Sequence, residues 1–141
     1  MKKYVFLTVM AVFFASFLGS TEAQAGSSTL KLSVSPTIPA AEGTIKIKKM
    51  SDGNTSVYVL VKHMAAPEKL TPPAVTYVVW IRANKDAEPQ NVGMLSVDKN
   101  LNGELETTTP LNSFDLMITG EISGQVQKPS GQPLLWTSFS S

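Results

Sequence analysis

The sequence predicts an all-β protein: a single immunoglobulin-like antiparallel β-sandwich of about 7–8 strands that follows a signal peptide. Three observations carry this prediction. Apolar and polar residues alternate with period two along most of the chain after residue 26. Turn-forming residues separate these segments at roughly ten-residue intervals. No segment after the N-terminal region has the apolar spacing of an amphipathic helix.

The first residues have the composition of an export signal. Lys2 and Lys3 make a positively charged start, and residues 4–18 are apolar or small. Ala23 and Ala25 place small residues at the positions read by a signal peptidase, so cleavage is expected before Gly26.

We therefore expect residues 1–25 to be a signal peptide and residues 26–141 to form the β-sandwich domain. The apolar stretch is about 15 residues, shorter than the ~20 expected of a membrane-spanning helix. The alternative is an uncleaved N-terminal anchor. The expected location is extracytoplasmic, either periplasmic or secreted, and membrane association is expected only if the segment stays uncleaved.

The composition of the mature part excludes several classes of function. Removing residues 1–25 leaves 116 residues with ten basic and ten acidic side chains, so the net charge is close to zero. A neutral domain has no electrostatic attraction for nucleic acid or anionic lipid. The sequence has no cysteine, which excludes disulfides, a lipidated cysteine and thiolate metal sites. We expect no cofactor.

The first three strands are predicted by alternation and by a turn signal. Leu30, Leu32 and Val34 alternate with polar residues, which is typical of a half-buried strand. Segments 44–50 and 55–63 also alternate. They flank Asp-Gly at positions 52–53, which predicts a hairpin.

The central strand is predicted at 75–82 because both of its faces are apolar. Tyr77 and Val79 lie on one face with Ile81, and Val78 and Trp80 lie on the other. A strand buried on both faces belongs in the middle of a sheet.

Four more strands are expected in the second half of the chain. Segment 91–97 carries alternating apolar residues, and Asn102-Gly103 precedes the threonine-rich segment 104–109, a second hairpin signal. Segment 114–119 alternates again. Residues 123–133, rich in Gly, Pro, Ser and Gln, form a loop before the last strand at 134–139.

Several of these segments together resemble a known family. They are a Tyr-x-x-Trp strand, a Gly-x-Leu element, an Asn-Gly turn, a Phe-x-x-x-x-Thr-x-Glu strand and a Pro-Ser-Gly turn, found at residues 77–80, 92–95, 101–105, 114–121 and 128–131. In this order, over about residues 55–140, they resemble the extracytoplasmic C-terminal domain of the anti-sigma-K factor family.

The resemblance implies a β-sandwich outside the cytoplasm. Whole anti-sigma factors of this type also carry a cytoplasmic segment that binds the sigma factor and a transmembrane helix. Here a signal-like segment precedes the β-domain, so the resemblance implies a counterpart of the sensory or scaffold half without the sigma-binding part.

A weak candidate for a calcium site is formed by Asp98, Asn100 and Asn102. With Gly103 they match the first half of a D-x-[DN]-x-[DN]-G loop, in which oxygen ligands converge on one cation. The twelfth position holds Thr109 in place of the usual glutamate. A polar turn explains the same residues without an ion, and it is the favoured interpretation.

No catalytic group of residues is predicted, and we expect the protein not to be an enzyme. His63 is the single histidine and lacks the G-x-S-x-G context of a hydrolase. Four carboxylates fall on or beside neighbouring predicted strands: Glu104, Glu106, Asp115 and Glu121. Two of them could serve glycoside hydrolysis if they lay close together in a cleft. An outward polar strand face explains them more simply.

The two tryptophans differ in their expected roles. Trp80 lies in the central strand, so a core role is expected, together with Tyr77 and Val79. Trp136 lies near the terminus and is the better candidate for an exposed aromatic that stacks on a sugar or a peptide.

The sequence thus predicts an exported, non-enzymatic interaction or scaffold module of the cell envelope. The expected partner is an extracytoplasmic protein, met through an exposed sheet edge or the 123–133 loop. The alternatives are an extracytoplasmic sensory domain in anti-sigma-factor-type regulation and a weak calcium-binding module.

Overall fold

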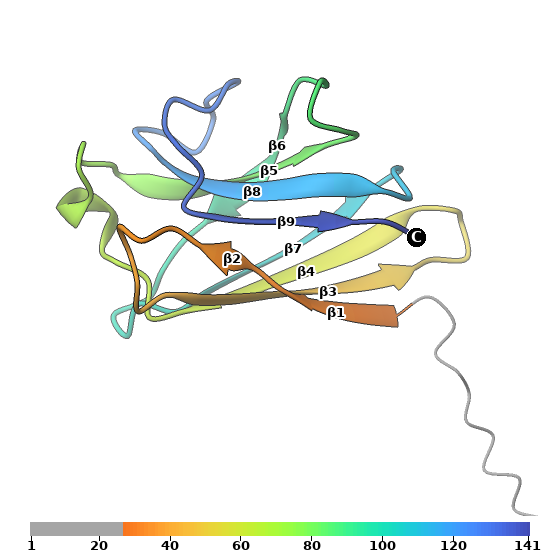
Figure 1. Ribbon diagram of the computed structural model, residues 1–141, viewed down its shortest axis with the longest axis horizontal. Helices are drawn as coiled ribbons and strands as arrows, with labels where there is room; N and C mark the ends of the chain where they lie inside the picture. The colour runs from red at the N-terminus through yellow and green to blue at the C-terminus, as the bar shows by residue number, and fades with distance from the viewer. Residues whose placement is uncertain (1–26) are drawn as a thin grey trace, which may run out of the picture.

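The computed structural model describes residues 27–141, which form a sandwich of two antiparallel sheets (Figure 1). Sheet A has the strand order β1-β3-β4-β7, and sheet B has the order β2-β9-β8-β5-β6. The strands are β1 (Ser27–Lys31), β2 (Ser33–Val34), β3 (Glu42–Lys49), β4 (Thr55–Lys62), β5 (Thr76–Arg82), β6 (Gln90–Leu95), β7 (Gly103–Thr109), β8 (Phe114–Glu121) and β9 (Leu135–Phe139).

The immunoglobulin-like β-sandwich predicted from the sequence is confirmed, with nine strands in place of seven or eight. The additional strand arises because the first predicted strand divides at Leu32. β1 pairs with β3 in sheet A, whereas β2 pairs with β9 in sheet B. Leu32 is buried, and its amide donates to the carbonyl of Gly43 at 2.8 Å where the chain passes between the sheets.

Gly43, which lacks a side chain, leaves room for two leucine side chains at this crossing. A Cβ at this position would lie 2.6 Å from Leu32 Cδ1 and 2.7 Å from Leu135 Cδ2. Such distances are too short for carbon atoms, so a larger residue would force the side chains of Leu32 and Leu135 to move.

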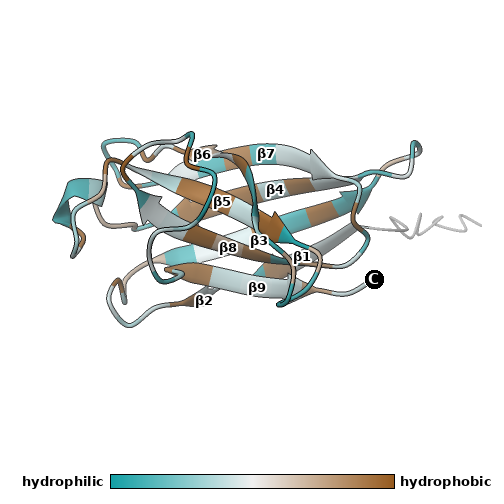
Figure 2. Cartoon of the chain, turned by 90° about the horizontal axis from the view of Figure 1, so that it is seen from above, coloured by the Kyte–Doolittle hydropathy of each residue, from teal (hydrophilic) through white to brown (hydrophobic). Residues whose placement is uncertain are grey.

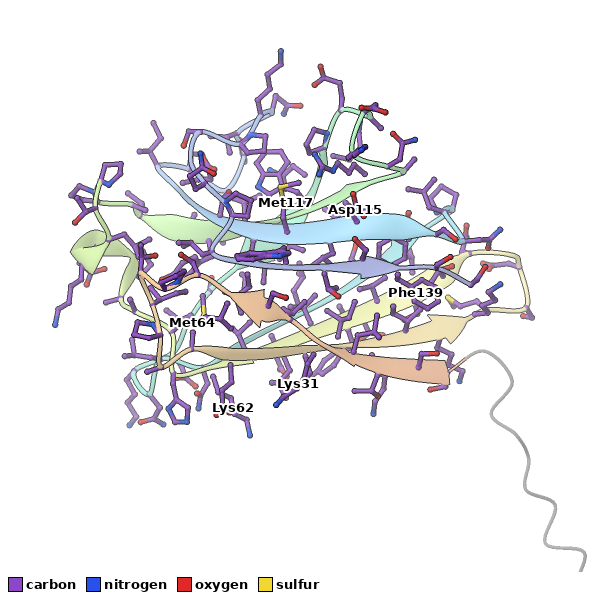
Figure 3. The ribbon with its side chains drawn as sticks, in the orientation of Figure 1. Lys31, Lys62, Met64, Asp115, Met117 and Phe139 are labelled. Atoms are coloured by element: carbon purple, nitrogen blue, oxygen red, sulfur yellow. The ribbon has the colours of Figure 1, made fainter. Side chains whose placement is uncertain are left out.

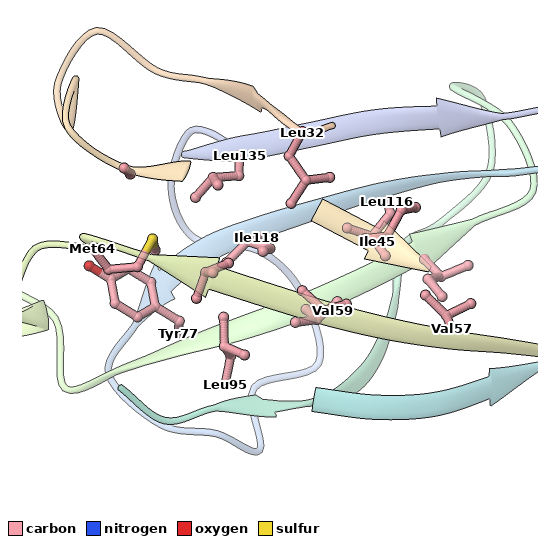
Figure 4. Close-up of a cluster of buried hydrophobic side chains, with 14 of the residues drawn as sticks. Leu32, Ile45, Val57, Val59, Met64, Tyr77, Leu95, Leu116, Ile118 and Leu135 are labelled. Carbon is pink, nitrogen blue, oxygen red and sulfur yellow. The ribbon is translucent and has the colours of Figure 1, made fainter. Parts of the chain in front are cut away.

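The core lies between the sheets and follows the period-two pattern of the sequence. Seen from above, brown apolar and teal polar segments share the same strands (Figure 2). The inward side chains of β3 and β4 meet those of β5 and β8 across the sandwich (Figure 4). They are Ile45, Ile47, Val57, Val59, Val61, Tyr77, Val79, Ile81, Leu116 and Ile118, all 0–2 % exposed.

β5 occupies an inner position in sheet B, between β6 and β8, as its two apolar faces predict. Tyr77 and Val79 belong to the core between the sheets. Trp80 is also buried, but it belongs to a separate cluster on the opposite face of sheet B.

The two turn signals have different outcomes. Asp52 and Gly53 form the predicted β3–β4 hairpin, in which Gly53 has a φ of 89°. Asn102-Gly103 does not join neighbours of one sheet, because β6 lies in sheet B and β7 in sheet A. Gly103 is required here by close packing, since a Cβ would lie 2.8 Å from the carbonyl oxygen of Ser96.

Tyr77 ties the β4–β5 connection to the core. Its hydroxyl donates to the carbonyl of Ala65 at 2.6 Å. Burial, with a smaller contribution from the charge of Glu68, raises the pKa of Tyr77 to about 12. The folded state therefore favours the neutral phenol.

Stability should consequently depend on pH in the alkaline range. The contribution of Tyr77 is complete below pH ~10, the unfolded pKa, and is lost as the pH rises through about 12. We expect the free energy of unfolding to fall by about 2 kcal/mol over this window from Tyr77 alone. Urea titrations of the wild type and of Tyr77→Phe at each pH measure this. Parallel profiles for the wild type and Tyr77→Phe between pH 10 and 12 would contradict the assignment.

Candidate functional site

The outer face of sheet B is divided between a covered half and an open half. The covered half lies beneath residues 122–134, called the covering loop below. Val78, Trp80 and Met117 form a second buried cluster there, against which Val126 of the loop packs. Figure 3 shows Met117 and Asp115 on the side of β8 that faces away from sheet A.

A chain of hydrogen bonds holds the covering loop against the sheet. Trp80 Nε1 donates to Thr119 Oγ1 at 2.8 Å, and Thr119 Oγ1 donates to Glu121 Oε2 at 2.5 Å. Ser130 then donates to the same carboxylate, from its hydroxyl at 2.6 Å and from its amide at 3.1 Å. Glu121 is only 1 % exposed, and a buried carboxylate needs hydrogen-bond donors in place of water. Thr119 and Ser130 supply these donors.

The first part of the loop has its own attachment. The side-chain amide of Asn91 on β6 donates to the carbonyls of Gly124 at 3.0 Å and Val126 at 2.9 Å. The inner side of the covering loop thus packs on the sheet. Of the 123–133 loop predicted as a contact surface, the side chains exposed to solvent include Ser123, Gln125 and Gln127.

The open half of this face contains a groove of about 340 Å³, called the Trp136 groove below. Trp136 is 40 % exposed, in agreement with the exposed position expected from the sequence. It pairs with Met117 across the β8–β9 ladder, so the two side chains are neighbours on one face. The groove is lined by Arg82, Asp115, Leu116, Met117, Gln132, Pro133, Trp136, Thr137 and Ser138.

An ion pair forms the polar part of the groove. Arg82 Nε donates to Asp115 Oδ2 at 3.3 Å, and the Ser138 hydroxyl donates to Asp115 Oδ1 at 2.7 Å. Both charged side chains are about one-quarter exposed. Within residues 27–141, Arg82 bonds to other protein groups through its Nε. Its two terminal amino groups can therefore donate to water or to a ligand.

A second hollow, of about 500 Å³, lies between the β5–β6 turn and the covering loop. It is larger than the Trp136 groove but consists of amides, one carboxylate and backbone, with no aromatic side chain. Its Asn91 amide is already bonded to the loop. It is lined by Glu88, Pro89, Gln90, Asn91, Gly124, Gln125 and Gln127. The chemistry of the Trp136 groove makes it the better candidate site.

The residues of the calcium candidate form a hydrogen-bonded turn. Asp98 Oδ1 accepts the backbone amides of Asn100 at 2.8 Å and Asn102 at 3.0 Å. Asn102 Oδ1 accepts the amide of His63 at 3.3 Å, so the turn also holds the end of β4. Two of the three candidate ligand side chains are therefore engaged in building the turn. Calcium binding here stays a prediction.

The structure separates the four carboxylates that the sequence placed on neighbouring strands. Glu104 and Glu106 are exposed on the outer face of sheet A, where the Tyr58 hydroxyl donates to Glu104. This hydrogen bond is the main cause of a raised pKa for Tyr58. Asp115 and Glu121 lie on the outer face of sheet B. Because these two outer faces lie on opposite sides of the sandwich, the four carboxylates do not form one site.

The remaining residues singled out in the sequence are the histidine, the lysines and the cleavage residues. His63 is exposed just after β4, with a φ of 55°. Figure 3 places Lys31 and Lys62 on the outer side of sheet A, where exposed Lys46 and Lys48 also lie. Within residues 27–141, no group of three or more metal-ligating side chains of the His, Cys, Asp or Glu type comes together. The predicted cleavage residues Ala23, Ala25 and Gly26 lie outside the described part.

Reasoning from the sequence missed the charged residues that line the groove together with Trp136. Arg82 and Asp115 are far apart in the chain, and the antiparallel β5–β8 register makes them direct neighbours. The one local signal was the period-two relation of Trp136 and Ser138, which places both on one strand face.

Comparisons of the chain with protein-family models, with curated proteins and with solved structures found no match. In the part of the chain that the structure describes, no helix has the length and apolar character needed to cross a membrane.

Proposed function

We propose that this chain is an exported, non-enzymatic binding module of the cell envelope that uses the outer face of sheet B. The observation that carries the proposal is Trp136, 40 % exposed in a groove beside the Arg82–Asp115 ion pair. Binding sites commonly combine an aromatic or apolar surface with a few positioned polar groups in a concave setting.

The covering loop supports this choice of face. Partly buried hydrogen bonds from Asn91 and to Glu121 fix the loop on the sheet, and Gln132 and Pro133 of this loop form one wall of the groove. A site on a rigid sheet bounded by a fixed loop loses little conformational entropy when a ligand binds.

The alternative is an extracytoplasmic sensory domain in anti-sigma-factor-type regulation. The residues that carry the family resemblance include Trp80, Thr119, Glu121 and Ser130, which form one chain of hydrogen bonds. These hydrogen bonds explain why the four residues occur together in a β-sandwich, independently of the ligand that the domain binds. The resemblance therefore supports a shared fold ahead of a shared partner.

Export is tested by fractionating cells that express the full chain and measuring the intact mass of the protein in each fraction. We expect a soluble extracytoplasmic species that begins at Gly26. A membrane-bound species that keeps residues 1–25 would favour the regulatory alternative. A cytosolic species that keeps them would overturn the proposal.

Binding is tested by co-sedimentation of the recovered protein with washed cell-wall material. We expect the wild type to sediment with the wall and Trp136→Ala to lower the bound fraction at least about fivefold, whereas Lys46→Ala on sheet A leaves it unchanged. Equal sedimentation of wild type and Trp136→Ala would exclude this face as the binding surface.

A further inference from the structure

We propose that the Trp136 groove binds a neutral saccharide, with one sugar ring against the indole of Trp136 and its hydroxyl groups bonded to Arg82, Asp115 and Gln132. This inference rests on the proposed binding function and assigns the class of ligand.

The aromatic part of the site suits a sugar ring. A pyranose has a face of C–H groups and a rim of hydroxyls, so it needs a flat apolar surface bordered by polar groups. The indole of Trp136 is the large exposed aromatic in this groove, and its neighbour Met117 is buried at 7 % exposure. An indole supplies a rigid contact area at a small cost in side-chain entropy.

The polar part of the site has the donors and acceptors that hydroxyl groups require. Asp115 holds Arg82 through Nε, so the guanidinium is oriented before a ligand arrives and its terminal amino groups still have donors to offer. Ser138 orients the same carboxylate from β9. Gln132 adds an amide with both donor and acceptor atoms at the rim.

The charge of the groove indicates a neutral ligand. Arg82 and Asp115, the charged side chains of the lining, neutralise each other at 3.3 Å. An anionic polymer would gain little from a guanidinium already paired with a carboxylate. Hydroxyl groups, in contrast, use a donor and an acceptor placed side by side.

The competing ligand is a peptide added to the edge of sheet B. β2 pairs with β9 at Leu135 and Trp136, and residues 137–139 continue beyond it. Only three residues of edge are offered there, which is short for strand addition. The combination of indole, ion pair and amide favours the saccharide.

The test is isothermal titration calorimetry of the recovered protein with three soluble neutral tetrasaccharides, namely tetra-N-acetylchitotetraose, cellotetraose and maltotetraose. We expect at least one to bind. Trp136→Ala should lower its association constant at least about tenfold, and Asp115→Asn should lower it severalfold. Lys46→Ala is the matched control on the opposite sheet. Because the ligand is neutral, raising NaCl from about 50 to about 500 mM should change the affinity less than twofold.

The outcomes separate this inference from the proposed function. Wall binding that depends on Trp136 without binding of any tetrasaccharide would overturn the saccharide assignment and leave the binding function intact. Tetrasaccharide binding unaffected by Trp136→Ala would also overturn it, as would Trp136-dependent binding of an unglycosylated tetrapeptide in place of the sugars. If the wild type binds neither the cell-wall material nor any of the tetrasaccharides, the proposed binding function is overturned as well.

Discussion

Replacing Trp80 with alanine is expected to lower the free energy of unfolding by about 3–5 kcal/mol, the range for removing a large aromatic from a packed interior. Trp80 is 0 % exposed and holds the second cluster together with Val78, Met117 and Val126. The change also removes the donor to Thr119. Urea denaturation followed by circular dichroism measures the loss.

Two further variants separate burial from hydrogen bonding. Trp80→Phe keeps much of the apolar contact but lacks the N–H, so a smaller loss of about 1–2 kcal/mol is expected. Trp136→Ala removes the exposed indole and should change stability by less than about 1 kcal/mol. A loss below 1 kcal/mol for Trp80→Ala would mean that the cluster on the outer face contributes little to folding.

Replacing Glu121 with alanine should destabilise the protein by roughly 3 kcal/mol and free the covering loop. The carboxylate accepts hydrogen bonds from Thr119 and from the amide and hydroxyl of Ser130. Hydrogen bonds to charged groups contribute about 1.5–3 kcal/mol, and the buried hydroxyl of Thr119, left without its acceptor, adds a desolvation cost. Urea denaturation gives the global loss.

Limited digestion with thermolysin, which cleaves before apolar residues, reports on the loop itself. In Glu121→Ala, cleavage near Ile122 and Val126 should be at least about tenfold faster than in the wild type, at a urea concentration where both stay folded. Glu106→Ala removes an exposed carboxylate on sheet A and is the matched control, with an expected change within about 0.5 kcal/mol. Equal cleavage rates in all three proteins would show that Glu121 does not hold the loop.

The strand positions were predictable because strand burial follows a local rule. β4 alternates buried and partly exposed residues over its length, and the valines at 57, 59 and 61 all face the core. β5 was recognised as an inner strand from its two apolar faces. The predicted boundaries of most strands differ from the observed ones by one or two residues, as expected where hydrogen bonding beyond the local pattern decides the ends.

The features that the pattern did not predict depend on partners distant in sequence. The division of the first strand at Leu32 follows from pairing of β1 with β3 and of β2 with β9. The connection at Asn102-Gly103 crosses between sheets even though the same dipeptide favours a hairpin, because β7 pairs with β4 and β6 with β5. Local turn preference is worth less than the burial gained by these pairings.

Composition and alternation by themselves determined that this chain is a β-sandwich without disulfides and that the strand carrying Trp80 is buried on both sides. Whether each face of that strand meets the other sheet or the covering loop was decided only by the tertiary structure, as was the meeting of Arg82, Asp115 and Trp136 in one groove. The physical reason is that side-chain burial has a period of two within a single strand, whereas a site on a sheet face is assembled by the register between strands, to which residues far apart in the chain contribute.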